Sequence, residues 1–132
     1  MKILLDTSAY VAFKRNNVGV VSAVVAAEHV IFSPVVLGEL MFGFRNGSRF
    51  GENMEDLEQF LSHEAVALES IGKITSDRYS RIAARLREEG SPIPTNDIWI
   101  AAQTMEHGAE LVTTDHHFEK IAGLVYALHS ST

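Results

Sequence analysis

Residues 2–8 of the chain, Lys2-Ile3-Leu4-Leu5-Asp6-Thr7-Ser8, place a carboxylate directly after a short apolar run. A run of this kind, bounded by polar residues, is typical of a buried strand. The hydroxyls of Thr7 and Ser8 can cap a helix that continues through Phe13, because they accept hydrogen bonds from its first backbone N–H groups. The stretch therefore predicts a strand followed at once by a helix, with Asp6 at the carboxyl end of the strand.

The rest of the chain continues this alternation of strands and helices. Short apolar runs predict four further strands, at His29–Phe32, Ala65–Leu68, Ala109–Thr113 and Leu124–Leu128. Apolar periodicity and start signals predict helices at Val20–Glu28, from Ser33-Pro34 through Phe44, at Glu52–His63, at Thr75–Glu89, and from Thr95 or Asn96 to His107. The alternation predicts a three-layer α/β/α fold with a mainly parallel central sheet. Because no repeat or linker interrupts it, we expect residues 1–132 to form a single domain.

The composition is that of a globular protein: 132 residues, 46% of them hydrophobic, with a formal net charge of −6. The absence of cysteine excludes disulfides and thiolate metal sites. No apolar run approaches the roughly 20 residues that span a bilayer, and Asp6 interrupts any secretory signal, so we expect a cytoplasmic protein. The acidic balance argues against a nucleic-acid partner only if none of the carboxylates binds a metal ion.

Four acidic residues occupy positions that the predicted fold brings toward one edge of the sheet. Asp6 and Asp115 follow predicted strands, and ligands of open α/β sheets bind beyond the carboxyl ends of the strands. Asp97 and Glu39 lie near the starts of two helices, and the neighbours of Glu39 in sequence are apolar. Taken singly, Asp6 or Asp97 could be a helix cap and Asp115 a turn residue. Together, the four predict a site for Mg²⁺ or Mn²⁺, which prefer oxygen ligands.

The same segments resemble a known family, the PIN domains, and specifically the VapC group of toxin endoribonucleases. The resemblance lies in Leu4–Ser8, Val36–Leu40, Asn96–Ala102 and Leu111–Phe118. It implies that Asp6, Glu39, Asp97 and Asp115 are the catalytic, metal-binding acids, with Ser8 and Thr113 in supporting roles. It further implies Mg²⁺- or Mn²⁺-dependent cleavage of structured RNA, such as tRNA or ribosomal RNA. A homodimer and a small VapB-like antitoxin partner are also implied.

Several basic residues are weaker candidates for contacts with RNA phosphates. Lys14, Arg15, Arg45 and Arg49 follow segments that carry the acids, and His116-His117 follow Asp115. Either histidine could contact a phosphate or donate a proton, although a solvent-exposed turn is the simpler interpretation. For Arg78, Arg81 and Arg85, which share a helix face, we favour a solvated surface paired with nearby acids. Three aromatic residues could line a groove for the antitoxin peptide: Phe42, Phe44 and Phe50.

Other functions for a small acidic α/β protein are less consistent with the sequence. A phosphoacceptor domain usually has two adjacent acids after its first strand, whereas Asp6 is flanked by Leu5 and Thr7. A phosphatase with an Asp-x-Asp motif would need an acid where Ser8 stands. An alternative of another class is a binding and regulatory role within an antitoxin–toxin repressor complex. The partner would then supply the DNA contacts, because the chain has only 11 Lys and Arg residues.

Overall fold

The computed structural model describes all residues 1–132, and its centre is a five-stranded sheet in which every neighbouring pair of strands is parallel. The strands are β1 (Lys2–Leu5), β2 (His29–Phe32), β3 (Val66–Leu68), β4 (Glu110–Thr113) and β5 (Tyr126–Leu128). The helices are α1 (Thr7–Lys14), α2 (Val18–Ala26), α3 (Pro34–Arg45), α4 (Phe50–Ser62), α5 (Lys73–Glu89), α6 (Thr95–Glu106) and the 3₁₀ helix η1 (His116–Lys120). The predicted α/β/α fold with a parallel sheet is confirmed.

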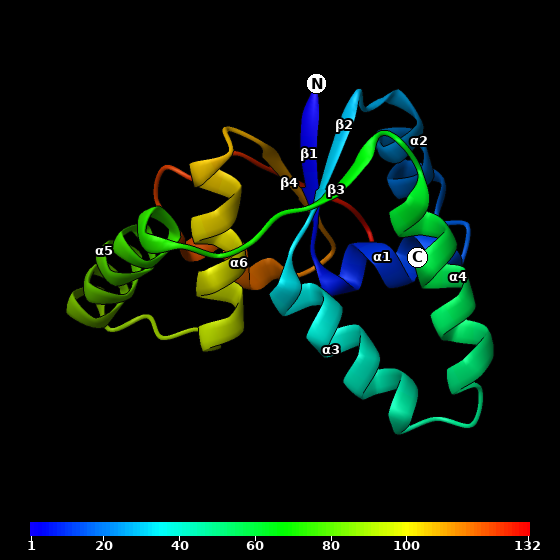
Figure 1. Cartoon of the computed structure of the whole chain (residues 1–132). Coiled ribbons are helices and arrows are strands. Elements are labelled where there is room, and N and C mark those ends of the chain that lie inside the picture. Colours follow the sequence, from blue (N-terminus) through cyan, green and yellow to red (C-terminus); the bar gives the residue numbers. More distant parts are fainter.

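Helices cover both faces of the sheet. Figure 1 shows α5 and α6 on one side of the strands and α1, α2 and α4 on the other, with the α3–α4 hairpin extending beyond the sheet. The side chains of β1 alternate accordingly. Leu4 belongs to a core cluster that contains Ile100 of α6, whereas Ile3 and Leu5 belong to a second cluster that contains Val20 of α2. A sheet buried on both faces explains why its strands are almost uniformly apolar.

The strand order, β3-β2-β1-β4-β5, locates a switch point in the topology. The chain builds outward from β1 through β2 to β3, and then returns to the other side of β1 to add β4 and β5. At such a point the connections leave the carboxyl ends of two adjacent strands in opposite directions, which opens a crevice for a ligand. The crevice lies where β1 and β4 end, with Leu5 in register with Val112.

Several boundaries differ from prediction by one or two residues. Helix α2 spans Val18–Ala26 instead of Val20–Glu28, because the Asn17 side chain caps it by accepting a hydrogen bond from the Val20 N–H. Helix α5 starts at Lys73, two residues before the predicted Thr75, and α4 starts at Phe50. Strands β3 and β4 each begin one residue late. Strand β5 begins only at Tyr126, two residues after the predicted Leu124, and follows a turn in which Gly123 has a φ of +82°.

Two predicted helix caps are wrong, and one is confirmed. Helix α1 is capped by Asp6 rather than by Thr7 or Ser8, because a carboxylate accepts hydrogen bonds well at the positive end of a helix. Helix α6 follows Pro94 and has no side-chain cap, so Thr95 and Asn96 do not act as caps. Ser33 does cap α3, with Pro34 as its first residue, as the sequence predicted. No helix is both long and apolar enough to cross a membrane.

The buried sheet predicts a large loss of stability for Leu111→Ala in β4. Leu111 is fully buried, and truncating a buried leucine costs about 2–5 kcal/mol of unfolding free energy. Val25→Ala on α2, where the valine is 78% exposed, should change stability by no more than about 0.5 kcal/mol. Urea unfolding followed by circular dichroism measures both. Similar midpoints for the two variants would contradict the packing of β4 described here.

Candidate active site

The four acids predicted from the sequence all lie at the carboxyl edge of the sheet or at helix starts beside it. Asp6 directly follows β1, and Asp115 follows β4 after one intervening residue. Asp97 is in the first turn of α6, and Glu39 lies in the second turn of α3. The switch point between β1 and β4 therefore brings together residues that are far apart in sequence.

Asp6 is almost fully buried, at 4% exposure, and both of its oxygens accept hydrogen bonds. Its Oδ1 accepts from the Ala9 N–H and from the Ser8 hydroxyl, each at 2.8 Å. Its Oδ2 accepts from the Thr113 hydroxyl at 2.6 Å. Asp6 therefore ends β1, caps α1 and contacts β4 at the same time. The two residues predicted to have supporting roles, Ser8 and Thr113, both lie against its carboxylate.

The two hydroxyls also hold the loop that carries Asp115. The Thr113 hydroxyl accepts a hydrogen bond from the Asp115 N–H at 2.9 Å, and the Ser8 hydroxyl accepts one from the Thr114 N–H at 3.0 Å. Each hydroxyl thus donates to Asp6 and accepts from the β4–η1 loop. This arrangement sets the position of Asp115 relative to Asp6. It depends on the ability of a single hydroxyl to donate one hydrogen bond and accept another.

Glu39 connects two helix starts. Its Oε1 accepts a hydrogen bond from the Thr7 hydroxyl at 2.6 Å, and its Oε2 accepts one from the Asn96 side-chain amide at 3.2 Å. From the sequence, Thr7 and Asn96 were expected only as helix caps, and their contact with Glu39 was missed. Nothing local in the sequence signals it, because the partners are 32 and 57 residues away from Glu39.

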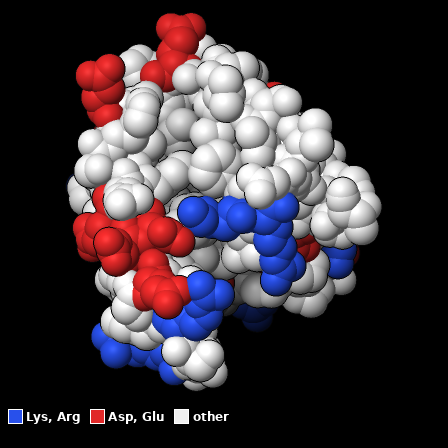
Figure 2. All heavy atoms as spheres, turned by 90° about the vertical axis from the view of Figure 1, so that its right-hand side faces the viewer, with Lys and Arg blue, Asp and Glu red and all other residues white.

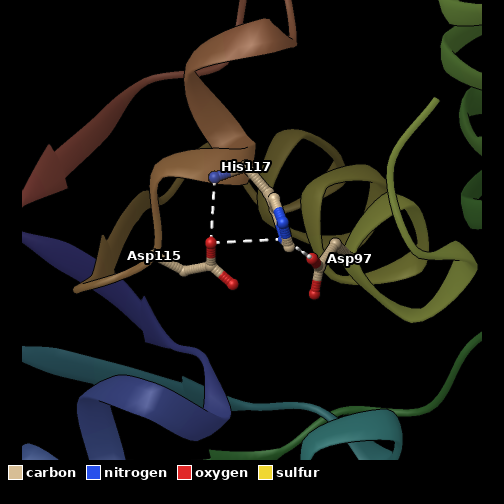
Figure 3. A group of neighbouring side chains, drawn as sticks. All are labelled: Asp97, Asp115 and His117. Carbon is tan, nitrogen blue, oxygen red and sulfur yellow. Dashed lines mark hydrogen bonds and ion pairs between the residues drawn. The ribbon is translucent and has the colours of Figure 1, made fainter. Parts of the chain in front are cut away.

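Asp97, Asp115 and His117 form the most compact group of ionisable side chains, drawn in Figure 3. One ligand atom from each lies within 4.8 Å of the others. The Nδ1 of His117 is 3.0 Å from Asp97 Oδ2 and 3.2 Å from Asp115 Oδ1. The backbone N–H of His117 also donates to Asp115 Oδ1 at 2.9 Å, and this hydrogen bond fixes the first turn of η1. Asp6 and Glu39 lie outside this group of three.

The crowding of negative charge and the burial both act on the protonation of these acids. Burial raises the pKa of Asp6 to about 6, against the opposing effect of its three hydrogen bonds and with a small further rise from the charge of Asp115. Burial also raises the pKa of Asp97, as do the charges of Asp115 and Glu39, whereas His117 lowers it. The carboxylates therefore share one electrostatic field, which a bound cation would neutralise.

The residues fit a divalent cation. Carboxylate oxygens are the ligands that Mg²⁺ and Mn²⁺ prefer. Asp97 and Asp115 are partly exposed and point toward one another (Figure 3), so they would hold the ion directly. Three of the roughly four acceptor positions of the Asp6 carboxylate are already occupied, which leaves it one for a metal or a metal-bound water. Glu39 would complete the acidic environment from the side of α3.

The predicted phosphate contacts are mostly engaged elsewhere. Lys14 is 3.6 Å from Asp56, Arg49 pairs with Glu52, and the Arg45 guanidinium lies 4.4 Å from the centre of the Phe50 ring. His116 is 79% exposed and its ring pairs with Glu119, so the two adjacent histidines face different partners. Arg15 alone of this set has no ion pair or ring contact. It lines a hollow of about 490 Å³ that also includes Ser8 and Thr114, next to Asp6.

Comparison with known proteins places this geometry in a family. Residues 3–124 match the model of the PIN domain. The chain belongs to the PIN-domain family. This PIN domain is 25% identical to ribonuclease VapC1 of Haemophilus influenzae, over 94% of this chain and 95% of that protein. It is 29% identical to ribonuclease VapC2 of Rickettsia felis, over 73% of this chain and 71% of that one. The predicted resemblance to VapC proteins is confirmed.

Solved structures agree with the fold of this PIN domain. A chain of the VapBC2 complex of Rickettsia felis, bound to a DNA fragment from its promoter, superimposes with a TM-score of 0.88. It is 23% identical, and the match covers 98% of this chain and all of that one. A chain of VapBC-1 from nontypeable Haemophilus influenzae superimposes with a TM-score of 0.84 at 22% identity, covering 97% and 98% of the two chains.

The raised pKa of Asp6 predicts a specific pH dependence of stability in metal-free protein. A carboxyl that ionises near 3.8 when unfolded and near 6 when folded binds its proton more tightly in the folded state. Its contribution therefore becomes less favourable as pH rises from about 4 to 6, by up to about 3 kcal/mol. Urea unfolding of the wild type and of Asp6→Asn is measured in EDTA at pH 4 and at pH 7.5. The free energy of unfolding of the wild type, relative to that of the variant, should be lower at pH 7.5 than at pH 4. A difference that does not change with pH would contradict the raised pKa.

Proposed function

We propose that this protein is a Mg²⁺- or Mn²⁺-dependent endoribonuclease and the toxin of a VapBC-type toxin–antitoxin pair. Its family and the names of its relatives support a ribonuclease. The observation that carries the metal dependence is the convergence of Asp97 and Asp115 beside the buried Asp6 at the switch point of the sheet. We take the catalytic domain to be the whole of residues 1–132.

In the proposed mechanism the four acids hold the metal and the attacking water. A bound divalent ion lowers the pKa of a water and neutralises charge on the phosphodiester. Asp97 and Asp115 would hold the ion, and Asp6 would orient a water through its one remaining acceptor position. Ser8 and Thr113 keep the Asp6 carboxylate in place, and Thr7 and Asn96 do the same for Glu39. The positioned water would attack the phosphorus in line, so that a new P–O bond forms, the P–O bond on the opposite side breaks, and the leaving oxygen takes up a proton.

The substrate we propose is structured RNA, either tRNA or a ribosomal RNA loop. Because the chain is acidic overall, RNA must be held by a few local basic groups and by the metal ion. Arg15 is the best placed of these, since the hollow that it lines reaches Ser8 and Thr114 beside the acids. A phosphate in that hollow would be close to Ser8, whose hydroxyl donates to Asp6.

A VapB-like antitoxin and a second copy of the chain are the proposed partners. A hollow of about 290 Å³ between α1, α3 and α4 is lined by the apolar side chains of Val11 and Phe44 and by the charged side chains of Lys14 and Asp56. Figure 2 shows acidic and basic side chains close together on the side of the molecule that carries α4. An amphipathic antitoxin helix could bury apolar side chains in this hollow and pair its charges at the rim. Of the aromatic residues predicted for such a groove, Phe44 lines it and Phe42 is 68% exposed on the same helix.

Cleavage of RNA tests the proposed activity. Purified protein free of antitoxin should cut total tRNA or ribosomal RNA into discrete fragments with Mg²⁺ or Mn²⁺, and EDTA should abolish cleavage. Asp115→Asn should lower kcat by at least about 100-fold, because losses of 10- to 100-fold follow even from changes to residues that only support metal ligands. Asp77→Asn is the matched control: it removes the same charge from an exposed α5 residue paired with Arg81.

The alternative is a binding role within an antitoxin–toxin repressor complex, and the same experiment distinguishes it. Intact RNA with both metals, from folded protein that still binds its antitoxin, would contradict the nuclease proposal and favour the regulatory role. Equal activity of Asp115→Asn and the wild type would instead contradict the assignment of the site, even if cleavage is observed.

The position of Arg15 predicts a selective effect on RNA binding. Arg15→Ala should weaken binding to RNA several-fold and lower the slope of log Kd against log salt concentration by about 1, as expected for one lost phosphate contact. Arg49→Ala is the control, since Arg49 already pairs with Glu52. Fluorescence anisotropy with a labelled tRNA measures both, in an Asp115→Asn background that prevents cleavage. Equal salt slopes for all proteins would rule out the Arg15 contact.

A further inference from the structure

The side chain of His117 places a ring nitrogen among the carboxylates of the acidic site. Its Nδ1 lies 3.0 Å from Asp97 Oδ2 and 3.2 Å from Asp115 Oδ1, so one nitrogen faces both carboxylates (Figure 3). Nδ1 carries at most one hydrogen, and two carboxylate oxygens compete for it. A cation in place of that hydrogen would satisfy both oxygens and accept the lone pair of the nitrogen.

Two of the three separations among these atoms are those of neighbouring ligands on a single ion. Neighbouring ligands of an octahedral ion at 2.0–2.1 Å from the metal are about 3 Å apart. The Nδ1–oxygen separations of 3.0 and 3.2 Å match this spacing, and all three ligand atoms fit within 4.8 Å. Small movements of the side chains would therefore admit an ion among them.

The backbone holds His117 in this position, and the site remains open to solvent. Asp115 caps η1 and accepts from the His117 N–H at 2.9 Å, while the next residue, Phe118, is fully buried and anchors the turn. The His117 side chain is itself 46% exposed, so water and ions can reach it. The adjacent His116 pairs with Glu119 instead. Of the two adjacent histidines, therefore, only His117 faces Asp97 and Asp115.

We propose that His117 is a ligand of the metal ion together with Asp97 and Asp115, and that its nitrogen makes the site select Mn²⁺ over Mg²⁺. Mg²⁺ is a hard ion that binds almost only oxygen, whereas first-row transition ions also accept imidazole. Of these ions, Mn²⁺ shares the preference for carboxylate that two of the three ligands require. The proposal rests on the metal dependence proposed above and adds the identity of one ligand and the choice of ion.

Metal binding without RNA tests this inference independently of catalysis. The full chain is titrated with Mn²⁺ and with Mg²⁺ by calorimetry, and the Mn²⁺ complex is examined by pulsed electron paramagnetic resonance for coupling to a directly bound ¹⁴N nucleus. The wild type should show this coupling. His117→Ala should lose it and bind Mn²⁺ about 10- to 100-fold more weakly, with a change in Mg²⁺ affinity of less than about 3-fold. Circular dichroism establishes that the variants are folded.

Two further variants make the experiment decisive. His116→Ala should keep both the ¹⁴N coupling and the Mn²⁺ affinity, since its ring pairs with Glu119. His117→Asp replaces nitrogen by oxygen, so it should lack the coupling and show a lower ratio of Mn²⁺ to Mg²⁺ affinity than the wild type.

Two results would overturn the inference. One is the absence of ¹⁴N coupling in wild-type protein that has bound Mn²⁺. The other is equal or tighter Mn²⁺ binding by His117→Ala, which would mean that the imidazole does not bind the ion. Neither result depends on RNA cleavage. A protein that binds Mn²⁺ through nitrogen but leaves RNA intact would contradict the proposed function and not the ligand.

Discussion

The hydrogen bond from the Thr113 hydroxyl to Asp6, at 2.6 Å in the buried interior, joins the two strands on either side of the switch point. The same hydroxyl accepts from the Asp115 N–H, so the two acids at the ends of β1 and β4 are held in a fixed relation. Asp6 also caps α1 through the Ala9 N–H. One buried carboxylate thus contributes to the sheet, the first helix and the acidic site. This position costs free energy, because burial disfavours the charged carboxylate and raises its pKa to about 6.

Around this contact the site separates into a supported part and an open part. The supported part contains Asp6 and Glu39, whose oxygens already accept hydrogen bonds from three hydroxyls, one side-chain amide and one backbone N–H. The open part contains Asp97 and Asp115, which are partly exposed and have only His117 between them. Such a division suits metal chemistry, because the open acids can bind an ion while the supported acids keep their geometry. A cation bound among these carboxylates would reverse the local sign of the charge, which is how an acidic protein could accept an RNA phosphate.

The carboxylates of the site were predictable because their positions depend on local patterns. Asp6 and Asp115 follow apolar runs that form strands, and parallel strands end at the same edge of the sheet. Glu39 was conspicuous as an acid among apolar neighbours. The roles of nearby polar residues were less predictable. Thr7 and Asn96 are residue types that commonly cap helices, but in the structure both donate hydrogen bonds to Glu39. The basic candidates depended even more on context, because an ion pair with a neighbour removes a lysine or arginine from consideration.

The sequence by itself determined the order of strands and helices, the parallel α/β/α architecture, the Ser33-Pro34 helix start and the four acids that end near one edge. These features follow from apolar periodicity and helix capping, which involve residues only a few positions apart and do not depend on how the rest of the chain packs. Only the tertiary structure decided that the Thr113 hydroxyl donates to Asp6, that Arg15 shares a hollow with Ser8 and Thr114, and that His117, and not His116, faces Asp97 and Asp115. His117 and Asp97 are 20 residues apart and Asp6 and Thr113 are 107 apart. Contacts over such separations depend on how the helices and strands pack, and no local pattern encodes that packing.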